Sequence, residues 1–204
     1  MITGVILAGG LNRRMGGKSK ALLPIQDQPL LLRQLTEISR ICNQTIVISN
    51  EPEAFQLLLA SNPTPMNVQW VSDIYVQKGP LSGIHAAAKA ATEQFMWIVG
   101  CDMPFISSDA AEAMKQLCQE ANVDAVIPVI DGKVHPLHGI YSRLVGSEAE
   151  VLLKQEQYRL MGLLDHIDWL PAENAFFEKL NLSSKFVANV NTPDEYKFML
   201  ENLS

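Results

Sequence analysis

The chain has 204 residues, of which 48% are hydrophobic and 19% charged, a composition typical of a folded protein and not of a disordered one. A formal net charge of −6 argues against general binding to nucleic acid, and three cysteines without a CxxC pair argue against a disulfide framework or a thiolate zinc site. Because no apolar run approaches the roughly 18 to 20 residues of a membrane span and the start does not resemble a secretory signal, we expect a cytoplasmic protein without a membrane partner.

Short apolar segments alternate with helical ones along the first 130 residues. Ile2–Leu7 is apolar and rich in β-branched residues, which predicts a buried parallel strand. Further strands are predicted at Thr45–Ser49, Val68–Val71, Phe95–Val99 and Ala125–Val129. Helices are predicted between them at Leu30–Ile41, Glu53–Leu59, Leu81–Ala91 and Ser108–Ala121, the last with Ser107 or Ser108 as its N-cap. The alternation predicts an α/β fold: a Rossmann-like, three-layer αβα arrangement with an open, mostly parallel sheet.

The rhythm is looser after residue 129. A turn is predicted at Asp131-Gly132, and Thr192-Pro193 followed by two acids predicts the start of a closing helix. Between them we predict a strand near Leu137–Tyr141 and helices around Glu148–Lys154 and Leu160–Leu164. Because no linker or repeat marks a boundary, we expect a single domain over residues 1–204.

The connection after the first strand concentrates glycine and positive charge. Between Leu7 and Lys20 lie four glycines and four of the sixteen basic residues of the chain. Glycines let backbone N–H groups approach phosphate oxygens, and Arg and Lys add charged contacts, so we interpret the segment as a phosphate-binding loop. The alternative is a solvated connection. A P-loop is excluded because Asn12 stands where its leading glycine belongs, and no G-x-G-x-x-G supports a dinucleotide site.

Polar residues follow the other predicted strands, at the edge where ligands bind in open α/β sheets. Asp102 is a candidate Mg²⁺ ligand or a turn-capping acid. Asn50 offers a donor and an acceptor to a base or ribose, although it also suits a turn before Glu51-Pro52. The small residues from Gly79 to Gly83 permit either a ligand near the helix N-terminus or tight helix packing.

Several other residues have simpler interpretations. The pair His135 and His138 lacks a companion ligand pattern, so we assign no metal to it and expect a structural or second-substrate role. Met96 and Trp97 fit the core, and Cys101 has no neighbouring base and fits a small packing residue.

The residues Leu7-Ala8-Gly9-Gly10, Arg14-Met15-Gly16 and Lys20 resemble the opening signature of nucleotidyltransferases, and specifically of the molybdenum cofactor guanylyltransferases, the MobA family. Ser19 departs from the family pattern, which commonly has an acid there. The resemblance continues along nearly the whole chain through Asn50, Ser72-Asp73, Gly79 to Ile84, Cys101 to Phe105, His135-Pro136 and Asn189 to Pro193.

The resemblance implies a nucleotide-diphospho-sugar transferase-like fold, with a nucleotide-binding half of about residues 1–105 and an acceptor-binding half of about 106–204. It implies transfer of GMP from GTP to the terminal phosphate of molybdopterin, with release of pyrophosphate. Because the nucleophile is a phosphate, alignment and charge neutralisation would suffice for catalysis. Mg²⁺, or Mn²⁺ in its place, would be held by Asp102.

The family also implies roles for individual residues. Arg14, Lys20 and Asp102 would be catalytic. Nucleotide would be bound by Leu7, Ala8, Gly9, Gly10, Lys20, Asn50, Asp73, Gly79 and Asp102, with Asp73 alternatively a solvated loop acid. The acceptor would contact His135, Asn189 and Asn191, although Asn191 could instead cap the last helix.

Other functions stay open from the sequence. A cytidylyltransferase for molybdopterin or another nucleotidyltransferase on the same scaffold is the nearest alternative, and Gly9-Gly10 favours guanine because cytidylyl relatives more often have L-A-A-G there. A module that binds GTP and molybdopterin without chemistry is the alternative from another class. Proteins that make or receive the molybdenum cofactor would be its partners, and we expect a monomer.

Overall fold

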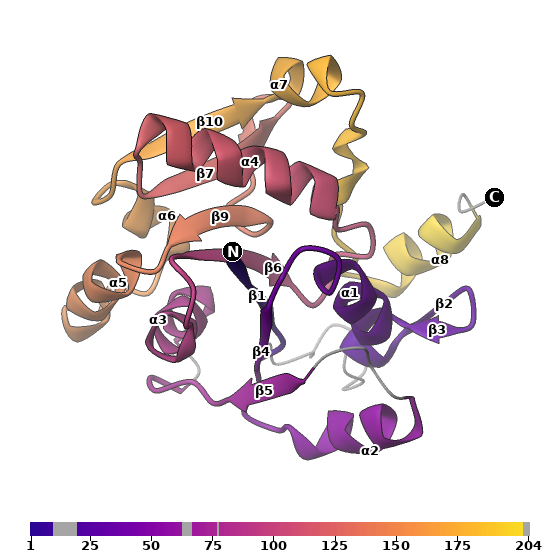
Figure 1. The fold of residues 1–204 in the computed structure, drawn as a ribbon. Helices are drawn as coiled ribbons and strands as arrows, with labels where there is room; N and C mark the ends of the chain where they lie inside the picture. Colours follow the sequence, from indigo (N-terminus) through magenta and orange to yellow (C-terminus); the bar gives the residue numbers. More distant parts are fainter. Residues whose placement is uncertain (10–19, 63–66, 77, 202–204) are drawn as a thin grey trace.

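The computed structural model describes residues 1–9, 20–62, 67–76 and 78–201. It contains a mixed sheet of eight strands in the order β10-β7-β9-β6-β1-β4-β5, with β8 paired to β7 (Figure 1). Its strands are β1 (Ile2–Leu7), β4 (Gln44–Ile48), β5 (Val68–Val71), β6 (Phe95–Gly100), β7 (Ala125–Ile130), β8 (Lys133–Val134), β9 (Gly139–Ser142) and β10 (Trp169–Glu173). A separate short hairpin joins β2 (Pro24–Ile25) to β3 (Gln28–Pro29).

The helices pack on both faces of the sheet. They are α1 (Leu30–Ile38), α2 (Glu53–Ser61), α3 (Pro80–Ala90), α4 (Ser108–Ala121), α5 (Val145–Lys154), α6 (Leu160–Leu164), α7 (Asn174–Lys179) and α8 (Pro193–Glu201), with short 3₁₀ turns η2 (Lys20–Leu22) and η3 (Ser184–Val187). Within the described residues, no helix combines the length and apolar character needed to cross a bilayer.

The strand pairing confirms the predicted open, mostly parallel sheet. β1 runs parallel to β4 and β6, β4 runs parallel to β5, and β10 runs parallel to β7. β9 is antiparallel to both of its neighbours, β6 and β7. The parallel strands β1, β4, β5 and β6 therefore end at one edge, where ligands bind in sheets of this kind.

Alternate side chains of each strand fill two separate cores. In β6, Trp97 and Val99 pack with α1 and α4, whereas Met96 and Ile98 pack with α3 and α5. Trp97 and Met96 are fully buried, as predicted for these two residues. Because both faces of the sheet are covered by helices, its strands are near-continuous apolar runs, and this made them recognisable in the sequence.

The predicted helix over Ser108–Ala121 is confirmed, and Ser107 is its N-cap, accepting from the backbone N–H of Ala110 at 3.2 Å. The helix predicted to reach Ile41 ends at Ile38, because the N–H groups of Arg40 and Ile41 bond back only three positions, in tighter turns that lead the chain toward β4. The strand predicted from residue 137 begins only at Gly139, since His138 has φ 75° and interrupts extended backbone.

Strand β10 and helix α7, both near residue 170, were not predicted from the sequence. β10 contains Pro171, which argues against a strand in the sheet interior. The sheet order places β10 at an edge, with β7 its neighbour in the sheet, where the missing N–H of proline is tolerated.

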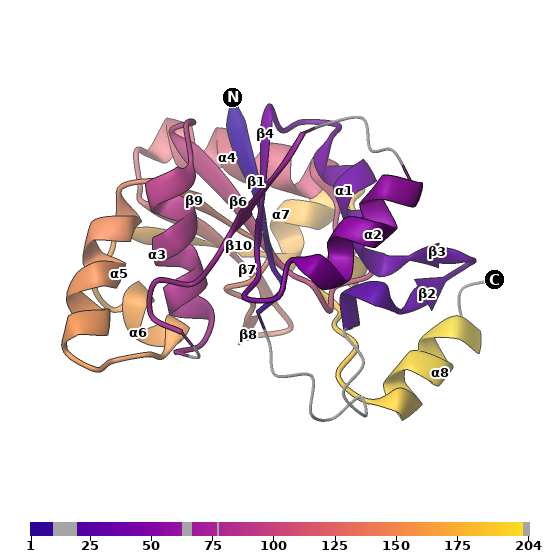
Figure 2. The ribbon, with the colours of Figure 1, turned by 90° about the horizontal axis from the view of Figure 1, so that it is seen from below.

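Helix α8 packs against the β2–β3 hairpin that precedes α1. Figure 2 shows α8 beside β2 and β3, and the hydroxyl of Tyr196 donates to the carbonyl oxygen of Pro24. A small apolar cluster joins Ile25 and Leu30 to Val190 and Met199. Helix α8 is thereby held near the segment that follows residue 20.

Candidate nucleotide site

The chain segments leaving three parallel strands are tied together by backbone hydrogen bonds. The N–H of Cys101, after β6, donates to the carbonyl of Leu7 at 3.1 Å. The N–H of Ala8 donates to the carbonyl of Ile48, the last residue of β4, at 2.8 Å. Leu7 to Gly9 therefore lie between the residues that follow β4 and those that follow β6. The predicted site residues Gly10 and Arg14 lie outside the described residues.

One group of predicted residues meets after β6. Lys20 Nζ lies 3.4 Å from Asp102 Oδ2 and donates to Asn191 Oδ1 at 2.9 Å. The side chains of Lys20 and Asp102 are 14% and 21% exposed, so this ion pair is shielded but open to a ligand. The structure thus brings together a cation, an anion and an amide from segments up to 171 positions apart.

The backbone around Asp102 fixes the direction of its carboxylate. A Cβ on Gly100 would lie 2.7 Å from Asp102 Oδ1 and 3.2 Å from Leu137 Cδ1, so any other residue at position 100 would displace the Asp102 carboxylate. The carbonyl of Asp102 accepts from the N–H of Val190 at 2.8 Å. The carboxylate therefore folds back over the end of β6, and the segment that leads to Asn191 is held against the same turn.

A second group forms after β4 and β5. Asn50 Nδ2 donates to Asp73 Oδ2 at 3.2 Å, and Asn50 Oδ1 accepts from the N–H of Asp73 at 3.1 Å. A Cβ on Gly9 would lie 3.4 Å from Asp73 Oδ2, which places the backbone of Gly9 against the carboxylate.

The carboxylate of this second group is partly buried. Asp73 Oδ1 is buried, and burial raises the pKa of Asp73, an effect that hydrogen bonding with Asn50 and Ser82 partly offsets. A buried carboxylate oxygen is costly unless a donor reaches it, so the geometry suits a ligand that presents an N–H or O–H group here.

The first turn of α3 lies beside Asp73. Gly79 precedes the helix with φ 79°, a conformation that favours glycine, and Pro80 occupies the first turn. A Cβ on Gly83 would lie 2.9 Å from Leu7 Cδ2 and 3.7 Å from Asp73 Oδ1. Tight packing of α3 on β1 therefore explains Gly83. Gly79 is exposed, and a Cβ there would meet only the carbonyl oxygen of Tyr158, at 3.7 Å, among the described residues.

Of the three residues expected to contact the acceptor substrate, only Asn191 is hydrogen-bonded to Lys20 among the described contacts. Asn191 joins Lys20, and the last helix is capped instead by Thr192, whose Oγ1 accepts from the N–H of Glu195 at 3.2 Å. Asn189 is exposed. His135 is half-buried, and burial lowers its pKa; the structure does not bring it into hydrogen-bond contact with Lys20 or Asp102 among the described residues.

His138 has a structural role, which is one of the two roles expected for the pair His135 and His138. It is fully buried against Trp97 and Phe186, and its Nε2 accepts from the N–H of Ser107 at 3.0 Å. Burial lowers the pKa of His138 to about 3, which keeps the ring neutral. Cys101 is a packing residue, because burial raises the pKa of its thiol to about 12 and leaves it unreactive.

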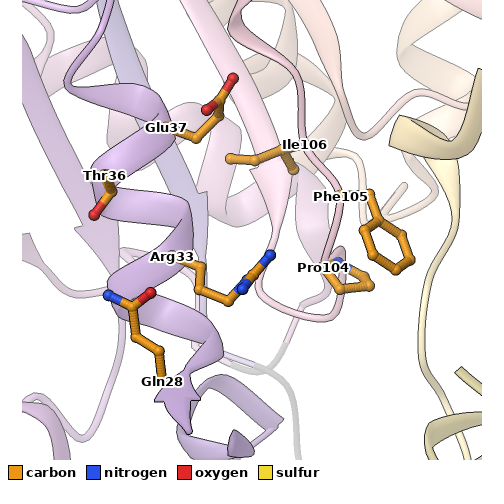
Figure 3. A pocket seen from close by; sticks show the side chains of 7 residues that line it. All are labelled: Gln28, Arg33, Thr36, Glu37, Pro104, Phe105 and Ile106. Carbon is orange, nitrogen blue, oxygen red and sulfur yellow. The ribbon is translucent and has the colours of Figure 1, made fainter. Parts of the chain in front are cut away.

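A pocket of about 380 Å³ lies between α1 and the segment after Asp102. Figure 3 shows Arg33 and Glu37 on α1 facing Pro104 and Ile106. Of the predicted site residues that the structure describes, none lines this pocket. Glu37 is already engaged there, since its Oε1 accepts from the backbone N–H and the hydroxyl of Ser108, each at 2.7 Å.

Sequence reasoning missed Gln34. Its side chain is 1% exposed and donates to the carbonyls of Gly100 and Met103 at 2.8 and 2.9 Å. The sequence did contain a sign of this role. The buried stripe of α1 has helical spacing and consists of Leu31, Gln34, Leu35 and Ile38, of which only Gln34 is polar.

The residues at this edge fit a magnesium ion that is shared with a phosphate ligand. Among residues 1–9, 20–62, 67–76 and 78–201, no three His, Cys, Asp or Glu side chains group closely enough to enclose a metal. Mg²⁺ commonly binds one or two carboxylates and completes its shell with water and substrate phosphates. Asp102 offers such a carboxylate, and Lys20 beside it supplies a charge for the phosphate.

Comparison with known proteins identifies the family. A family model described as MobA-like NTP transferase domain matches residues 4–169. A probable molybdenum cofactor guanylyltransferase of Halalkalibacterium halodurans is 31% identical over 94% of this chain and 94% of its own. A protein of Clostridium perfringens with the same description is 28% identical over 96% of this chain and 94% of its own.

A solved structure supports the fold. The molybdopterin-guanine dinucleotide biosynthesis protein A of Archaeoglobus fulgidus matches with a TM-score of 0.82 and 23% identity, covering 98% of this chain and 97% of its own. Its arrangement agrees with the predicted nucleotide-diphospho-sugar transferase-like fold. From the family match over most of its length, the chain belongs to the MobA-like NTP transferases.

Proposed function

We propose that this protein transfers GMP from GTP to the terminal phosphate of molybdopterin, forming the guanine dinucleotide cofactor. An oxygen of the acceptor phosphate attacks the α-phosphorus of GTP, and the bond from that phosphorus to the bridging oxygen breaks, which releases pyrophosphate. The descriptions of the relatives support this acceptor and this nucleotide.

The observation that carries the proposal is the contact of Lys20 with both Asp102 and Asn191 at the carboxyl end of β6. Attack by one phosphate on another requires neutralisation of negative charge more than a strong base. When GTP binds, the Lys20 ammonium would move from the carboxylate to phosphate oxygens, and Asp102 would hold Mg²⁺, which neutralises phosphate charge when bound. Asn191 would direct the lysine and contact the acceptor.

The second group gives the site a means to select the base. Asp73 presents a buried acceptor, and Asn50 orients it through two hydrogen bonds. Guanine presents adjacent N–H donors on its Watson–Crick edge, whereas cytosine presents an acceptor beside its amino group. Guanine therefore matches Asp73 better than cytosine does, and this favours GTP over CTP.

The direct experiment mixes the protein with Mg²⁺, molybdopterin and either GTP or CTP. We expect one pyrophosphate for each guanine dinucleotide formed, and a much lower rate with CTP. Tight binding of GTP and molybdopterin without pyrophosphate release would identify a non-catalytic module instead. Faster turnover with CTP would reassign the protein to cytidylyl transfer. Mn²⁺ in place of Mg²⁺ should also support the reaction.

A further inference from the structure

The turn that carries Asp102 is held by a buried amide on α1. Gln34 Nε2 donates one hydrogen to Gly100 O at 2.8 Å and the other to Met103 O at 2.9 Å. These carbonyls flank Cys101 and Asp102 on both sides. One side chain therefore bridges the entrance and the exit of the turn.

The remaining contacts of the turn show why this bridge matters. The N–H of Cys101 fixes the turn to β1, and Val190 fixes the carbonyl of Asp102 to the C-terminal segment. Met103 N also bonds to Gly100 O, but at the longer distance of 3.3 Å. Gln34 supplies the two short bonds that set the spacing between residues 100 and 103, and so the direction of the carboxylate between them.

The amide of Gln34 is the polar member of an otherwise apolar stripe. Its neighbours on the buried stripe, Leu31 and Leu35, are apolar and belong to the core beneath α1. Placing an amide among them also leaves Gln34 Oε1 buried without a hydrogen-bond partner among the described residues. An apolar side chain would avoid that cost but would leave the Met103 carbonyl without the donor that Gln34 supplies. The amide therefore satisfies both carbonyls only while the turn keeps the spacing that places them within its reach.

We propose that Gln34 is a positioning residue, which holds the Asp102 carboxylate in the direction needed to bind a metal-bound nucleotide. This inference rests on the proposed function for the role of Asp102. Gln34 itself touches neither nucleotide nor acceptor; it acts through the carbonyls of Gly100 and Met103.

The test replaces Gln34 with methionine, which has a similar length and no donor. Ile38→Val is the matched control, because Ile38 lies on the same buried stripe of α1. Mn²⁺ binding to the GTP-bound protein is measured by the loss of the free-ion electron paramagnetic resonance signal, and pyrophosphate release is measured in parallel. Thermal unfolding reports the stability of each variant.

We expect Gln34→Met to raise the half-saturating Mn²⁺ concentration and to lower kcat, each by roughly ten- to one-hundredfold, with the KM for GTP within about threefold of wild type. Ile38→Val should leave both quantities near wild type. Gln34→Asn retains the amide on a shorter arm that cannot span both carbonyls, so an intermediate loss is expected; it also serves as the test if the methionine variant does not fold.

Normal Mn²⁺ binding and normal kcat in a folded Gln34 variant would overturn the inference. So would losses that Ile38→Val reproduces once the two variants are compared at equal stability. If the wild-type protein binds Mn²⁺ and GTP but releases no pyrophosphate, the proposed reaction fails. The Mn²⁺ measurement would still decide the role of Gln34, so the two failures are distinguishable.

Discussion

Substitution of Lys20 by alanine separates a catalytic role of this residue from a structural one. In the free protein Lys20 contacts Asp102 at 3.4 Å and Asn191 at 2.9 Å, and its side chain is 14% exposed. Loss of a partly shielded ion pair and one charged hydrogen bond should cost about 1 to 2 kcal/mol, because the partners left behind can be hydrated. For a chain of this size that cost lowers Tm by roughly 2 to 8 °C.

The expected effect on turnover is larger. A cation that meets phosphate charge in the transition state contributes an amount comparable to an oxyanion-hole donor, about 10²- to 10³-fold in kcat. That factor corresponds to roughly 3 to 4 kcal/mol. Lys20→Ala should therefore remove most of the activity from a protein that remains folded at the assay temperature.

The assay couples pyrophosphate release to an optical signal and follows unfolding by calorimetry. Lys115→Ala is the matched control, since Lys115 is 13% exposed and pairs with Glu112 at 2.7 Å on α4, outside the contacts of the candidate site. The control should lose similar stability and keep its kcat. A kcat of Lys20→Ala within threefold of wild type, or a loss equal to that of the control, would refute the reasoning.

Two further results are expected. Asp73→Asn should weaken GTP binding roughly tenfold or more in calorimetric titrations, because the carboxylate acceptor becomes partly a donor, while Tm changes little; unchanged affinity would remove Asp73 from base recognition. The pKa of His138 is about 3 in the folded protein and about 6.5 in the unfolded chain. Between pH 6.5 and pH 3 the imidazole of His138 is therefore protonated in the unfolded chain and neutral in the folded protein. The free energy of unfolding does not depend on the protonation of His138 above pH 6.5, and it decreases as the pH falls toward 3, by up to about 1.4 kcal/mol per pH unit. His138→Gln should flatten this slope in denaturant titrations.

Much of the fold was predictable because the sheet is covered on both sides. Strands buried on two faces are continuous apolar runs, and β1, β4, β5 and β6 were all found within a residue or two of their ends. Strand β10 was not predicted, because Pro171 does not fit the pattern of an interior strand. The proline is tolerated because β10 lies at the edge of the sheet.

The candidate site was predictable in its residues but not in its connections. Asp102, Asn50 and Asp73 follow strands, and parallel strands must bring their ends to one edge. The contact of Lys20 with Asn191 joins residues 171 positions apart, and no local spacing encodes it. Gln34 was overlooked because an amide within a helical stripe reveals a role only when the carbonyls that it meets are known.

If the proposed function is right, a nucleoside triphosphate lies across the carboxyl ends of β1, β4 and β6. A crystal structure of the protein with Mg²⁺ and the α,β-methylene analogue of GTP tests it most directly. We predict phosphate oxygens within hydrogen-bond distance of Lys20 Nζ and the guanine edge against Asp73 and Asn50. An analogue bound elsewhere, such as the pocket beside Arg33, with the Lys20–Asp102 pair undisturbed, would contradict the account.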